Sequence, residues 1–503
     1  SWRGNFGFFA AIFVFLVAAF TLAIAPFGLR FLFKPFISVL LVLASVNSYF
    51  MDTYGVVIDD GMLRNTIQTD PREVDGLLSP VLFWHVLWAG VLPALVVWWV
   101  PVRYATFPRQ LGRQILTMAL ALAVAGAALY SHYKEFSLVG RENRNLRYLI
   151  NPSYSIYSAG KLLAAELSAG EAALRPLGRD AYQRQHSSPG GKPRLVVFVL
   201  GETVRAHNAT LEGYERRTMP LMAQEEIVKF DSVYSCGTAT AVSLPCMFSR
   251  QNRSSYDEFV SDNSENLLDV LKHAGVRVLW RENNSGCKGV CARVKTQNTA
   301  QMDVPNYCNE DGCFDEILLY RLDESLNEPS RDTFIVLHQQ GNHGPEYYKR
   351  YPPEFRKFQP ECRSNRPQDC SRQELINAYD NAILYTDFVL SRVVKFLKRN
   401  SDRYASAMIY MSDHGESLGE SGIYLHGLPY LIAPHEQTHV PLMVWTSSDF
   451  RKGRGLERKC MSQVNDQEYS QDNLFDTVLG LFAVQTQVYR PGQDIFAACP
   501  PPP

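Results

Sequence analysis

The stretch RLVVFVLGET, residues 194–203, decides the fold of this chain. Its six consecutive apolar residues, 195–200, have the length of one strand. Because these side chains would point to both faces of a sheet, the pattern is typical of a strand that is covered on both sides, as in a parallel sheet. Ligands of such sheets lie beyond the carboxyl ends of the strands. Glu202, directly after the run, is therefore a candidate functional residue.

The rest of residues 193–503 repeats this pattern. Further apolar runs of strand length lie at 276–280, 333–338, 406–411 and 442–445. Segments with helical spacing and charges on one face lie at 267–274, 373–397 and 471–482. The alternation predicts an α/β domain with a mostly parallel central sheet flanked by helices.

The composition of the 503 residues excludes several classes of protein. A chain with 46% hydrophobic and 20% charged residues is neither disordered nor fibrous. The net charge of −1 provides no basic surface for nucleic acid, so no nucleic-acid partner is expected. Residues 1–135 hold only nine Lys/Arg and seven Asp/Glu, and all ten cysteines lie at 236 or later. One part is therefore suited to lipid and the other to an aqueous, oxidising compartment.

Residues 1–135 are predicted to form a transmembrane domain. Four apolar segments suited to crossing a bilayer run over 6–29, 35–51, 77–102 and 115–130. The loops after the first and third segments are basic and carry Arg30, Lys34, Arg103, Arg109 and Arg113. Since positively charged loops stay in the cytoplasm, the acidic loop 52–76 and the chain after the fourth segment are expected on the opposite side. Residue 1 would then also lie outside, and it is Ser, so we expect a preceding fifth span that this numbering lacks.

Residues 136–192 are predicted to join the two domains. The segment 132–157 mixes aromatic and basic residues, which indicates either an amphipathic stretch on the membrane surface or an ordinary connecting helix. The polar segment 170–192 contains SSPGG and is predicted to be a linker.

The ten cysteines are expected to form five disulfides. Pairing by proximity joins Cys236 with Cys246, Cys287 with Cys291, Cys308 with Cys313, and Cys362 with Cys370, and it leaves Cys460 with Cys499. Sequence alone does not fix this connectivity. Thiolate zinc sites, the alternative, need closely spaced CxxC pairs, which the sequence lacks.

Candidate metal ligands follow the predicted strands. Glu202, Thr240, Asp413 and His414 together would make an oxygen-rich site suited to Zn²⁺. Glycine follows the candidate histidines His343, His414 and His426, and it permits close backbone approach at a crowded site. Thr240 lies between Cys236 and Cys246, and a threonine hydroxyl needs a metal or a base to act as a nucleophile. On composition alone, Thr238 or Ser243 would serve equally well.

The chain resembles a known enzyme family along its whole length. The strings FVLGETVRAHN, SCGTATAVSLPCMFS, NSGCKGVC, HQQGNHGPEYYKRYPPEF, YMSDHGESLGESGIYLHGLPY and YSQDNLF are similar to those of the lipid A phosphoethanolamine transferases. That family belongs to the alkaline phosphatase superfamily and includes enzymes that confer polymyxin (colistin) resistance. Its members have five spans, so this chain departs from them in lacking the first.

The resemblance implies a role for each matching residue. The zinc ligands would be Glu202, Thr240, Asp413 and His414, with Thr240 as the nucleophile that accepts phosphoethanolamine. The residues expected to contact substrate, transfer protons or bind a second zinc ion during turnover are Lys288, Ser285, His343 and His426. Donor headgroup binding is expected at Asn65, Thr69 and Glu73 in the acidic loop.

The expected protein is a monomeric zinc enzyme of the bacterial inner membrane, with residues 193–503 as a periplasmic catalytic domain. It would transfer phosphoethanolamine from phosphatidylethanolamine to a phosphate of lipid A, and the added amine would weaken the attraction of polymyxins and cationic peptides. The alternatives are transfer to a core sugar of lipopolysaccharide and a related sulfatase, phosphatase or phosphoglycerol transferase. A membrane sensor with structural zinc is disfavoured, because structural sites are closed sets of Cys and His.

Overall fold

The computed structural model describes residues 6–68, 74, 76–169, 173–184, 191–209, 211, 213–326 and 331–499. The chain divides into two compact units. The first, the helical unit, contains Ser1–Thr53 and Leu78–Ser158. The second, the α/β unit, contains Tyr54–Leu77 and Ala159–Pro503, so the acidic loop predicted between spans two and three belongs to it.

Four long apolar segments of the helical unit are able to cross a membrane, as predicted. They are Phe6–Phe27, Phe33–Tyr54, Pro80–Trp99 and Phe107–Ser131. Their helices are α1 (Phe6–Ile24), α2 (Phe33–Tyr54), α5 (Pro80–Val86), a π turn (Leu87–Val91), α6 (Leu92–Trp99) and α7 (Phe107–Ser131). The segment 132–157, predicted as an amphipathic stretch or a connecting helix, forms α8 (Tyr133–Glu142), a 3₁₀ helix (Arg144–Leu149) and the start of α9 (Ser153–Ala169).

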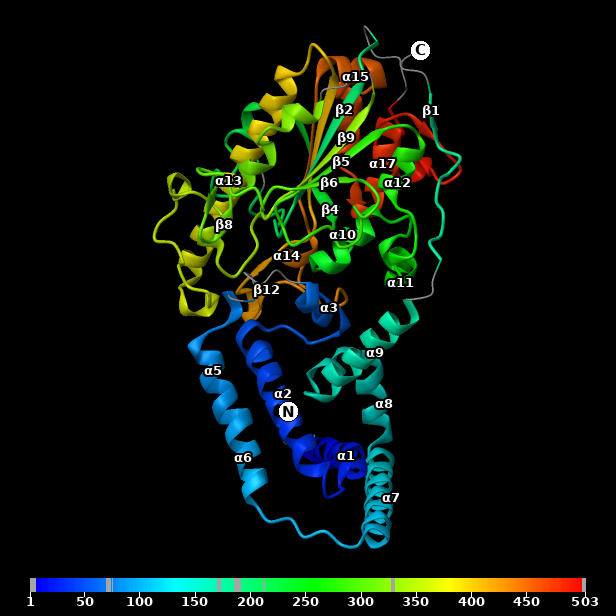
Figure 1. Cartoon of the computed structure of the whole chain (residues 1–503), viewed down its shortest axis with the longest axis vertical. Helices are drawn as coiled ribbons and strands as arrows, with labels where there is room; N and C mark the ends of the chain where they lie inside the picture. The colour runs from blue at the N-terminus through cyan, green and yellow to red at the C-terminus, as the bar shows by residue number, and fades with distance from the viewer. Residues whose placement is uncertain are drawn as a thin grey trace. The chain divides into compact units, whose positions relative to one another are not determined.

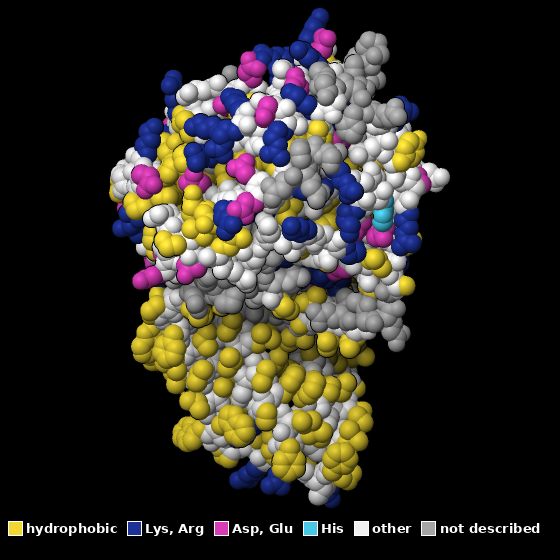
Figure 2. All heavy atoms as spheres, turned by 45° about the horizontal axis from the view of Figure 1, so that its top comes forward, with side chains coloured by type: hydrophobic (Ala, Val, Ile, Leu, Met, Phe, Trp, Pro, Cys, Tyr) yellow, Lys and Arg dark blue, Asp and Glu magenta, His cyan; other side chains and the backbone are white. Residues whose placement is uncertain are grey.

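Small side chains lie where helices of this unit meet. α1 packs against α7, and the buried side chains of the two helices are mostly alanines: Ala11, Ala18, Ala121, Ala125 and Ala128. Large apolar side chains point outward instead, and they cover most of the surface of this unit in Figure 2. This arrangement is the one expected of helices that meet lipid, where close packing of small residues holds helices together.

The α/β unit is built on a seven-stranded sheet with the order β3-β13-β10-β2-β9-β5-β6. Figure 1 labels β2, β9, β5 and β6 of this sheet. Its strands are β2 (Arg194–Gly201), β3 (Ile227–Phe230), β5 (Arg277–Glu282), β6 (Lys295–Asn298), β9 (Thr333–His338), β10 (Ala405–Ser412) and β13 (Leu442–Thr446). The five strands from β10 to β6 are parallel, and β13 runs antiparallel to both of its neighbours. The predicted α/β class is therefore confirmed, with a mixed sheet in detail.

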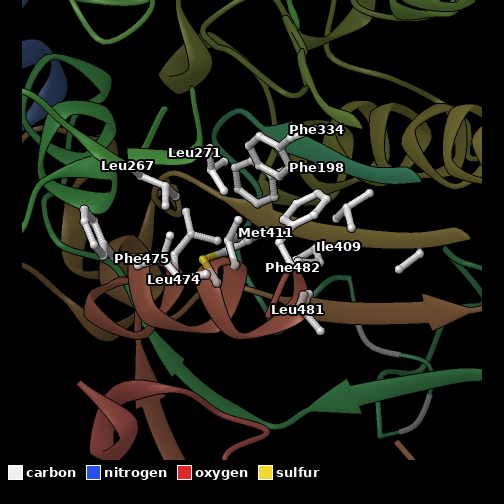
Figure 3. Close-up of a cluster of buried hydrophobic side chains, with 14 of the residues drawn as sticks. Phe198, Leu267, Leu271, Phe334, Ile409, Met411, Leu474, Phe475, Leu481 and Phe482 are labelled. Atoms are coloured by element: carbon white, nitrogen blue, oxygen red, sulfur yellow. The ribbon is translucent and has the colours of Figure 1, made fainter. Parts of the chain in front are cut away.

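Alternate residues of β2 enter two separate cores, as the period of a strand requires. Val196, Phe198 and Leu200 pack on the side of α10 (Thr240–Phe248), α12 (Leu267–His273) and α17 (Leu474–Leu481). Figure 3 shows this core, where Phe198 and Phe334 lie near Leu271, Ile409 and Phe482. The other β2 side chains pack against α13 (Arg372–Arg399) on the opposite face.

Short elements complete the α/β unit. The helices are α3 (Asp60–Gln68), α11 (Glu258–Asp262), α14 (His435–Thr438), α15 (Ser448–Arg454) and α16 (Arg458–Val464). The small strand pairs are β1 (Tyr182–Gln183) with β15 (Val484–Gln485), β14 (Glu468–Ser470) with β4 (Ser232–Tyr234), β7 (Cys308–Asn309) with β8 (Gly312–Cys313), and β11 (Ser417–Leu418) with β12 (Tyr424–Leu425).

Five disulfides join the ten cysteines of this unit. The bonded pairs are Cys236 with Cys246, Cys287 with Cys291, Cys308 with Cys313, Cys362 with Cys370, and Cys460 with Cys499. Four of the five close short loops, with sequence separations of 4 to 10 residues, and the fifth has a separation of 39. The pairing expected from proximity is therefore confirmed for every cysteine, including Cys291, Cys370 and Cys499.

Candidate active site

The carboxyl ends of the central parallel strands bring the predicted metal ligands together. In the register of the sheet, Ser412 of β10 lies beside Gly201 of β2. The next residues, Glu202 and Asp413, therefore leave adjacent strands at the same edge, and His414 follows. All three side chains are fully buried, and ligand atoms from each lie within 4.8 Å of one another.

Thr240 is the hydroxyl that enters this cluster. Its Oγ1 lies 2.9 and 3.0 Å from the two carboxylate oxygens of Glu202 and 3.3 Å from Nε2 of His414. Thr240 is the first residue of α10, and its side chain is buried. The partial positive charge of a helix N-terminus thus lies beside the hydroxyl, where it favours an anionic group such as a phosphate.

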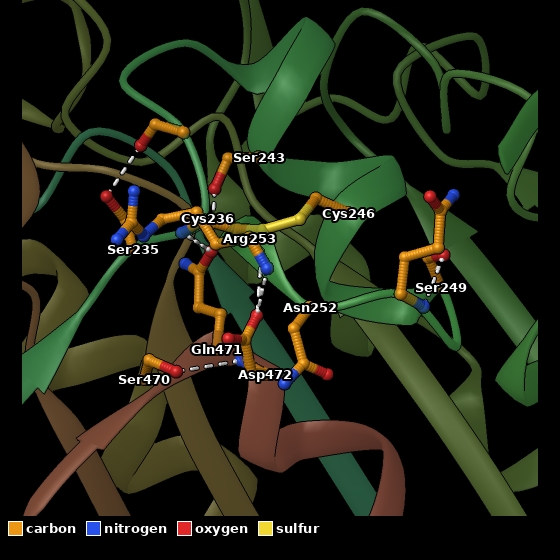
Figure 4. Close-up of a disulfide and its surroundings, with 12 residues drawn as sticks. Ser235, Cys236, Ser243, Cys246, Ser249, Asn252, Arg253, Ser470, Gln471 and Asp472 are labelled. Atoms are coloured by element: carbon orange, nitrogen blue, oxygen red, sulfur yellow. Dashed lines mark hydrogen bonds between the residues drawn. A yellow bond between two sulfur atoms is a disulfide. The ribbon is translucent and has the colours of Figure 1, made fainter. Parts of the chain in front are cut away.

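The two other candidate hydroxyls hold the surrounding backbone. Ser243 donates to the carbonyl of Asp413 and to Oε1 of Gln471. Thr238 donates to the carbonyl of Leu428 at 2.6 Å. Figure 4 shows Ser243 and Gln471 beside the Cys236–Cys246 disulfide that closes this loop. Of the three hydroxyls left open by composition, Thr240 is the one that hydrogen bonds with the side chains of the candidate metal ligands among the described residues.

The donor set fits a zinc ion. Oδ2 of Asp413 is buried, and among the described residues it has no hydrogen-bond partner, although Nε2 of His414 lies 3.3 Å away. The other oxygen, Oδ1, accepts from the backbone N–H groups of Thr203 and His414. Nδ1 of His414 faces the carbonyl of Gly415 at 2.9 Å and must donate to it, so Nε2 is directed toward the carboxylates. A histidine oriented through its other nitrogen is the usual arrangement at a metal site.

The charges of the cluster also favour a cation. Burial raises the pKa of Asp413 to about 6, and the nearby carboxylate of Glu202 adds to the effect. Burial lowers the pKa of His414, but the carboxylates of Asp413 and Glu202 outweigh it and raise the pKa to about 10. Two buried carboxylates thus hold a proton on the imidazole, and a bound metal ion would supply the same positive charge.

His343 and His426 lie next to the metal ligands. The ring centre of His426 is 4.3 Å from that of His414 and 5.3 Å from that of His343. Nδ1 of His426 contacts a carboxylate oxygen of Glu416 at 3.2 Å. Burial raises the pKa of Glu416 to about 8. The two histidines and Glu416 thus form a group of titratable side chains beside His414.

Glycine is required after His414. A Cβ atom at Gly415 would overlap the carbonyl oxygen of Glu436. The backbone N–H groups of Gly415 and Glu416 donate to the carbonyls of Gln437 and Glu436. The close approach predicted for a glycine that follows a histidine is therefore observed here.

The predicted substrate contacts lie partly together. Nζ of Lys288 donates to Oγ of Ser285 at 3.0 Å and to the carbonyl of Gln68, the last residue of α3, at 2.9 Å. Asn65 lies half-buried on the same helix. Thr69 and Glu73 lie outside the described residues.

Comparison with known proteins agrees with this geometry. A family model described as sulfatase matches residues 194–484, and one described as phosphoethanolamine transferase EptA/EptB matches residues 16–167. Phosphoethanolamine transferase EptA of Escherichia coli K12 is 40% identical over 471 residues, which cover 93% of this chain and 85% of that protein. The chain belongs to the phosphoethanolamine transferase family.

Two further relatives support the assignment of this chain to the phosphoethanolamine transferase family. Phosphatidylethanolamine transferase Mcr-1 of Escherichia coli is 41% identical over 495 residues, which cover 95% of this chain and 89% of that protein. The solved structure of EptA from Neisseria meningitidis, an integral membrane protein, has a TM-score of 0.92 at 38% identity and covers 99% of this chain and 96% of that one. The family predicted from the motif strings is confirmed.

The sequence did not predict two residues that position the candidate metal ligands of this transferase. Nδ2 of Asn284, which follows β5, donates to Oε2 of Glu202 at 2.7 Å. Nε2 of Gln471 donates to the carbonyls of Ser412 and Asp413, while its Oε1 accepts from the backbone N–H of Cys236. Both residues lie in or beside strings that resemble the family, and this is the signal that would have singled them out.

Proposed function

We propose that this chain transfers phosphoethanolamine from phosphatidylethanolamine to a phosphate of lipid A through a covalent phosphoethanolamine–Thr240 intermediate. The observation that carries the proposal is the Thr240 hydroxyl, which lies at a helix N-terminus within hydrogen-bond distance of Glu202 and near His414. One relative is named a phosphatidylethanolamine transferase, and a more distant one is named a Kdo(2)-lipid A phosphoethanolamine 7''-transferase. These names supply the donor and acceptor classes of the proposal.

The residues that would hold Zn²⁺ are Glu202, Thr240, Asp413 and His414. When bound, the ion lowers the pKa of a coordinated hydroxyl and offsets charge on phosphoryl oxygens. Identification of the metal as zinc rests on the mixture of carboxylate and imidazole ligands, with the thiols engaged in disulfides. A second ion during turnover would use His343 and His426.

In the first half-reaction, Oγ1 of Thr240 attacks the phosphorus of phosphatidylethanolamine. The Oγ1–P bond forms as the bond from phosphorus to the diacylglycerol oxygen breaks. The proton of the Thr240 hydroxyl passes to Glu202, whose carboxylate oxygens already accept it. His343 or His426 protonates the diacylglycerol oxygen as it leaves. Lys288 and Ser285 contact the phosphoryl group, and Asn65, Thr69 and Glu73 bind the donor headgroup.

In the second half-reaction, a phosphate oxygen of lipid A attacks the phosphorus held on Thr240. The new P–O–P linkage forms as the Oγ1–P bond breaks, and Thr240 recovers its proton. Both substrates are membrane lipids, which explains why a sulfatase-like unit is carried on apolar helices. We propose a monomer of the bacterial inner membrane, with a transmembrane domain at 1–135, a junction at 136–192 and a periplasmic catalytic domain at 193–503.

The test compares Thr240→Ala with the matched variant Thr240→Ser, which keeps the hydroxyl. Lipid A from cells that express each protein is analysed by mass spectrometry. The purified proteins are incubated with phosphatidylethanolamine, and their intact masses are measured. We expect a phosphoethanolamine adduct on lipid A and on the protein with wild type, reduced amounts with Ser, and neither with Ala.

Other outcomes distinguish the alternatives. A lipid A adduct made by Thr240→Ala would exclude the covalent step at this residue. A protein adduct without any lipid A adduct would still support Thr240 as the nucleophile, but the acceptor would then be a core sugar or water. Wild-type lipid A product should also lower the sensitivity of the cells to polymyxin, because the added amine reduces the negative charge of the surface.

A further inference from the structure

A second group of histidines lies in a surface pocket of the α/β unit. The pocket has a volume of about 370 Å³ and is lined by residues after β2, by β3 and by α14. Its histidines are His207, His435 and His439. Of the described residues, none of these three contributes to the Glu202–Asp413–His414 cluster.

His435 and His439 have the geometry of a chelating pair. α14 makes one helical turn, in which the N–H of His439 donates to the carbonyl of His435 at 2.9 Å. Residues four apart on a helix lie on one face, and here the two ring centres are 4.5 Å apart at an interplanar angle of 49°. With metal–nitrogen bonds of about 2.0–2.1 Å, two imidazoles on one metal ion place their ring centres about 4.5–5.5 Å apart.

His439 is oriented by the protein. Its Nε2 lies 2.7 Å from the carbonyl oxygen of Asp231, so this nitrogen carries the proton and donates it. Nδ1 is then the nitrogen with the lone pair in the neutral ring. A backbone carbonyl that fixes the tautomer in this way is a common second partner of a metal-binding histidine.

His207 also lines the pocket, but among the described residues it does not join His435 and His439 in a group whose ligand atoms all lie within 4.8 Å of one another. It follows β2 by six residues, and its ring packs edge-on against Tyr214 with centres 5.2 Å apart. Both His207 and His435 are exposed, so a metal ion can reach them from solvent. The acidic side chain of Asp231 at the rim is paired with Lys229 at 3.0 Å.

We propose that His435 and His439 chelate a transition-metal ion of the Zn²⁺, Ni²⁺ or Cu²⁺ class at a site distinct from the candidate active site. Imidazole nitrogens suit these metals, whereas Mg²⁺ and Ca²⁺ require oxygen ligands. The proposal goes beyond the transferase activity and does not depend on it.

Metal binding at this pocket would stabilise the folded chain. α14 is bonded through its backbone to the segment that follows the active-site ligands, since Gly415 and Glu416 donate to the carbonyls of Gln437 and Glu436. The N–H of Ala206, after Glu202, donates to the carbonyl of His439 at 3.0 Å. A ligand that binds only the folded state raises the melting temperature with its concentration.

The test uses the full chain in detergent micelles, loaded with one equivalent of Zn²⁺ per chain for the active site and then titrated with Ni²⁺ by calorimetry. We expect wild type to bind one equivalent of Ni²⁺ more than the double variant His435→Gln/His439→Gln. Ni²⁺ should raise the melting temperature of wild type and leave that of the double variant unchanged. The single variant His435→Gln, at an exposed position, should bind Ni²⁺ more weakly than wild type.

The matched control is His273→Gln, which removes a histidine of α12 that pairs with Glu265 outside this pocket. It should bind Ni²⁺ as wild type does. Equal Ni²⁺ binding by wild type and the double variant would overturn the proposal, and so would an equal loss in His273→Gln. Melting curves without Ni²⁺ establish that each variant is folded, and the exposed His435→Gln variant tests the site even if the double variant unfolds.

Discussion

The helical unit and the α/β unit place the same kinds of side chain in opposite positions. In the helical unit, Trp99 and Tyr130 are 86% and 88% exposed, while its buried apolar residues are mainly alanines. In the α/β unit, the whole strand β2 is buried and Phe198 is inaccessible, while carboxylates and a histidine are buried at the end of the sheet. Each unit is therefore folded for a different solvent.

Exposure therefore has a different meaning in the two units. Leu120 on α7 is 59% exposed, and Leu431 before α14 is 83% exposed. Beside lipid, an exposed leucine is in a favourable medium, whereas beside water it contributes little to stability. The α/β unit also buries charged groups. Its carboxylates lie beside an imidazole and a hydroxyl, and this arrangement fits a cation. The comparison can be tested by changing one side chain at a time.

Loss of the buried cation site should have the largest effect. Glu202→Gln removes the carboxylate charge that faces Thr240 and His414. We expect transferase activity to fall by about 10³-fold, because the nucleophile and the groups around it act as one unit. Strong chelation of wild type should have a comparable effect that added Zn²⁺ reverses. Lipid transfer assays and metal analysis of the purified protein measure both results.

The matched control is Glu265→Gln, which changes another buried glutamate of the α/β unit. Glu265 accepts from the N–H of Leu177 and contacts His273, away from the metal cluster. Its variant should keep the bound metal and most of the activity. Full activity and metal content in Glu202→Gln would contradict the assigned site.

Removal of a core side chain should give the next largest effect. Phe198 packs against Phe248 and Phe334, with ring centres 5.9 and 6.5 Å away. Phe198→Ala should cost about 3–5 kcal/mol of stability, because it leaves a cavity between the sheet and its helices. Phe13 on α1 is 69% exposed, and Phe13→Ala should change the melting temperature in detergent far less. Equal losses in the two variants would remove the distinction between the units.

The hydrophobic pattern predicts only those parts of the fold that depend on it. The bounds predicted for β2 and β9 agree with the observed ones to within one residue, and those of α13 to within two residues at either end. The edge strand β6 has the sequence KTQN, which carries no apolar signal and pairs only because β5 lies beside it. The direction of β13 was not predictable either, because an apolar run reads the same for a parallel or an antiparallel strand.

The residues of the candidate site were likewise predictable only in part. Glu202, Asp413 and His414 follow buried strands, so position alone indicated them. Choosing Thr240 over Ser243 required the structure or the family resemblance, because composition gives the two hydroxyls the same chemistry. Asn284 has no periodic pattern, and its bond to Glu202 depends on how the loop after β5 is folded.

A charge on an exposed leucine tests the difference in solvent directly. Leu120→Arg places a charge near the middle of a candidate span and should reduce its membrane insertion by about 3 kcal/mol. Leu431→Arg makes the same change on the α/β unit and should alter stability by less than about 0.5 kcal/mol. A membrane insertion assay for the span and thermal unfolding for the α/β unit measure the two effects. Similar tolerance of both changes would mean that α7 does not face lipid.

The smallest expected effect concerns a buried carboxylate that has no cationic partner among the described residues. Asp387 on α13 accepts from the N–H groups of Leu221 and Met222 at 2.8 Å each. Burial raises its pKa from 3.8 to about 6, although these two bonds oppose the shift. Since the raised pKa means that the folded state holds the proton more tightly than the unfolded state, the contribution to stability is complete below pH 3.8 and is lost as the pH rises through about 6.

This loss amounts to at most about 3 kcal/mol for a shift of about two pKa units. Asp387→Asn removes the titrating group, so its melting temperature should fall less than that of wild type as the pH rises through this window. Asp402→Asn changes an exposed aspartate in the loop before β10 and should keep the wild-type slope. The same slope in wild type and Asp387→Asn would mean that water or a cation reaches Asp387. Burial of an unpaired carboxylate would then carry no penalty in this unit, and the contrast between Asp387 and the Glu202 cluster would disappear.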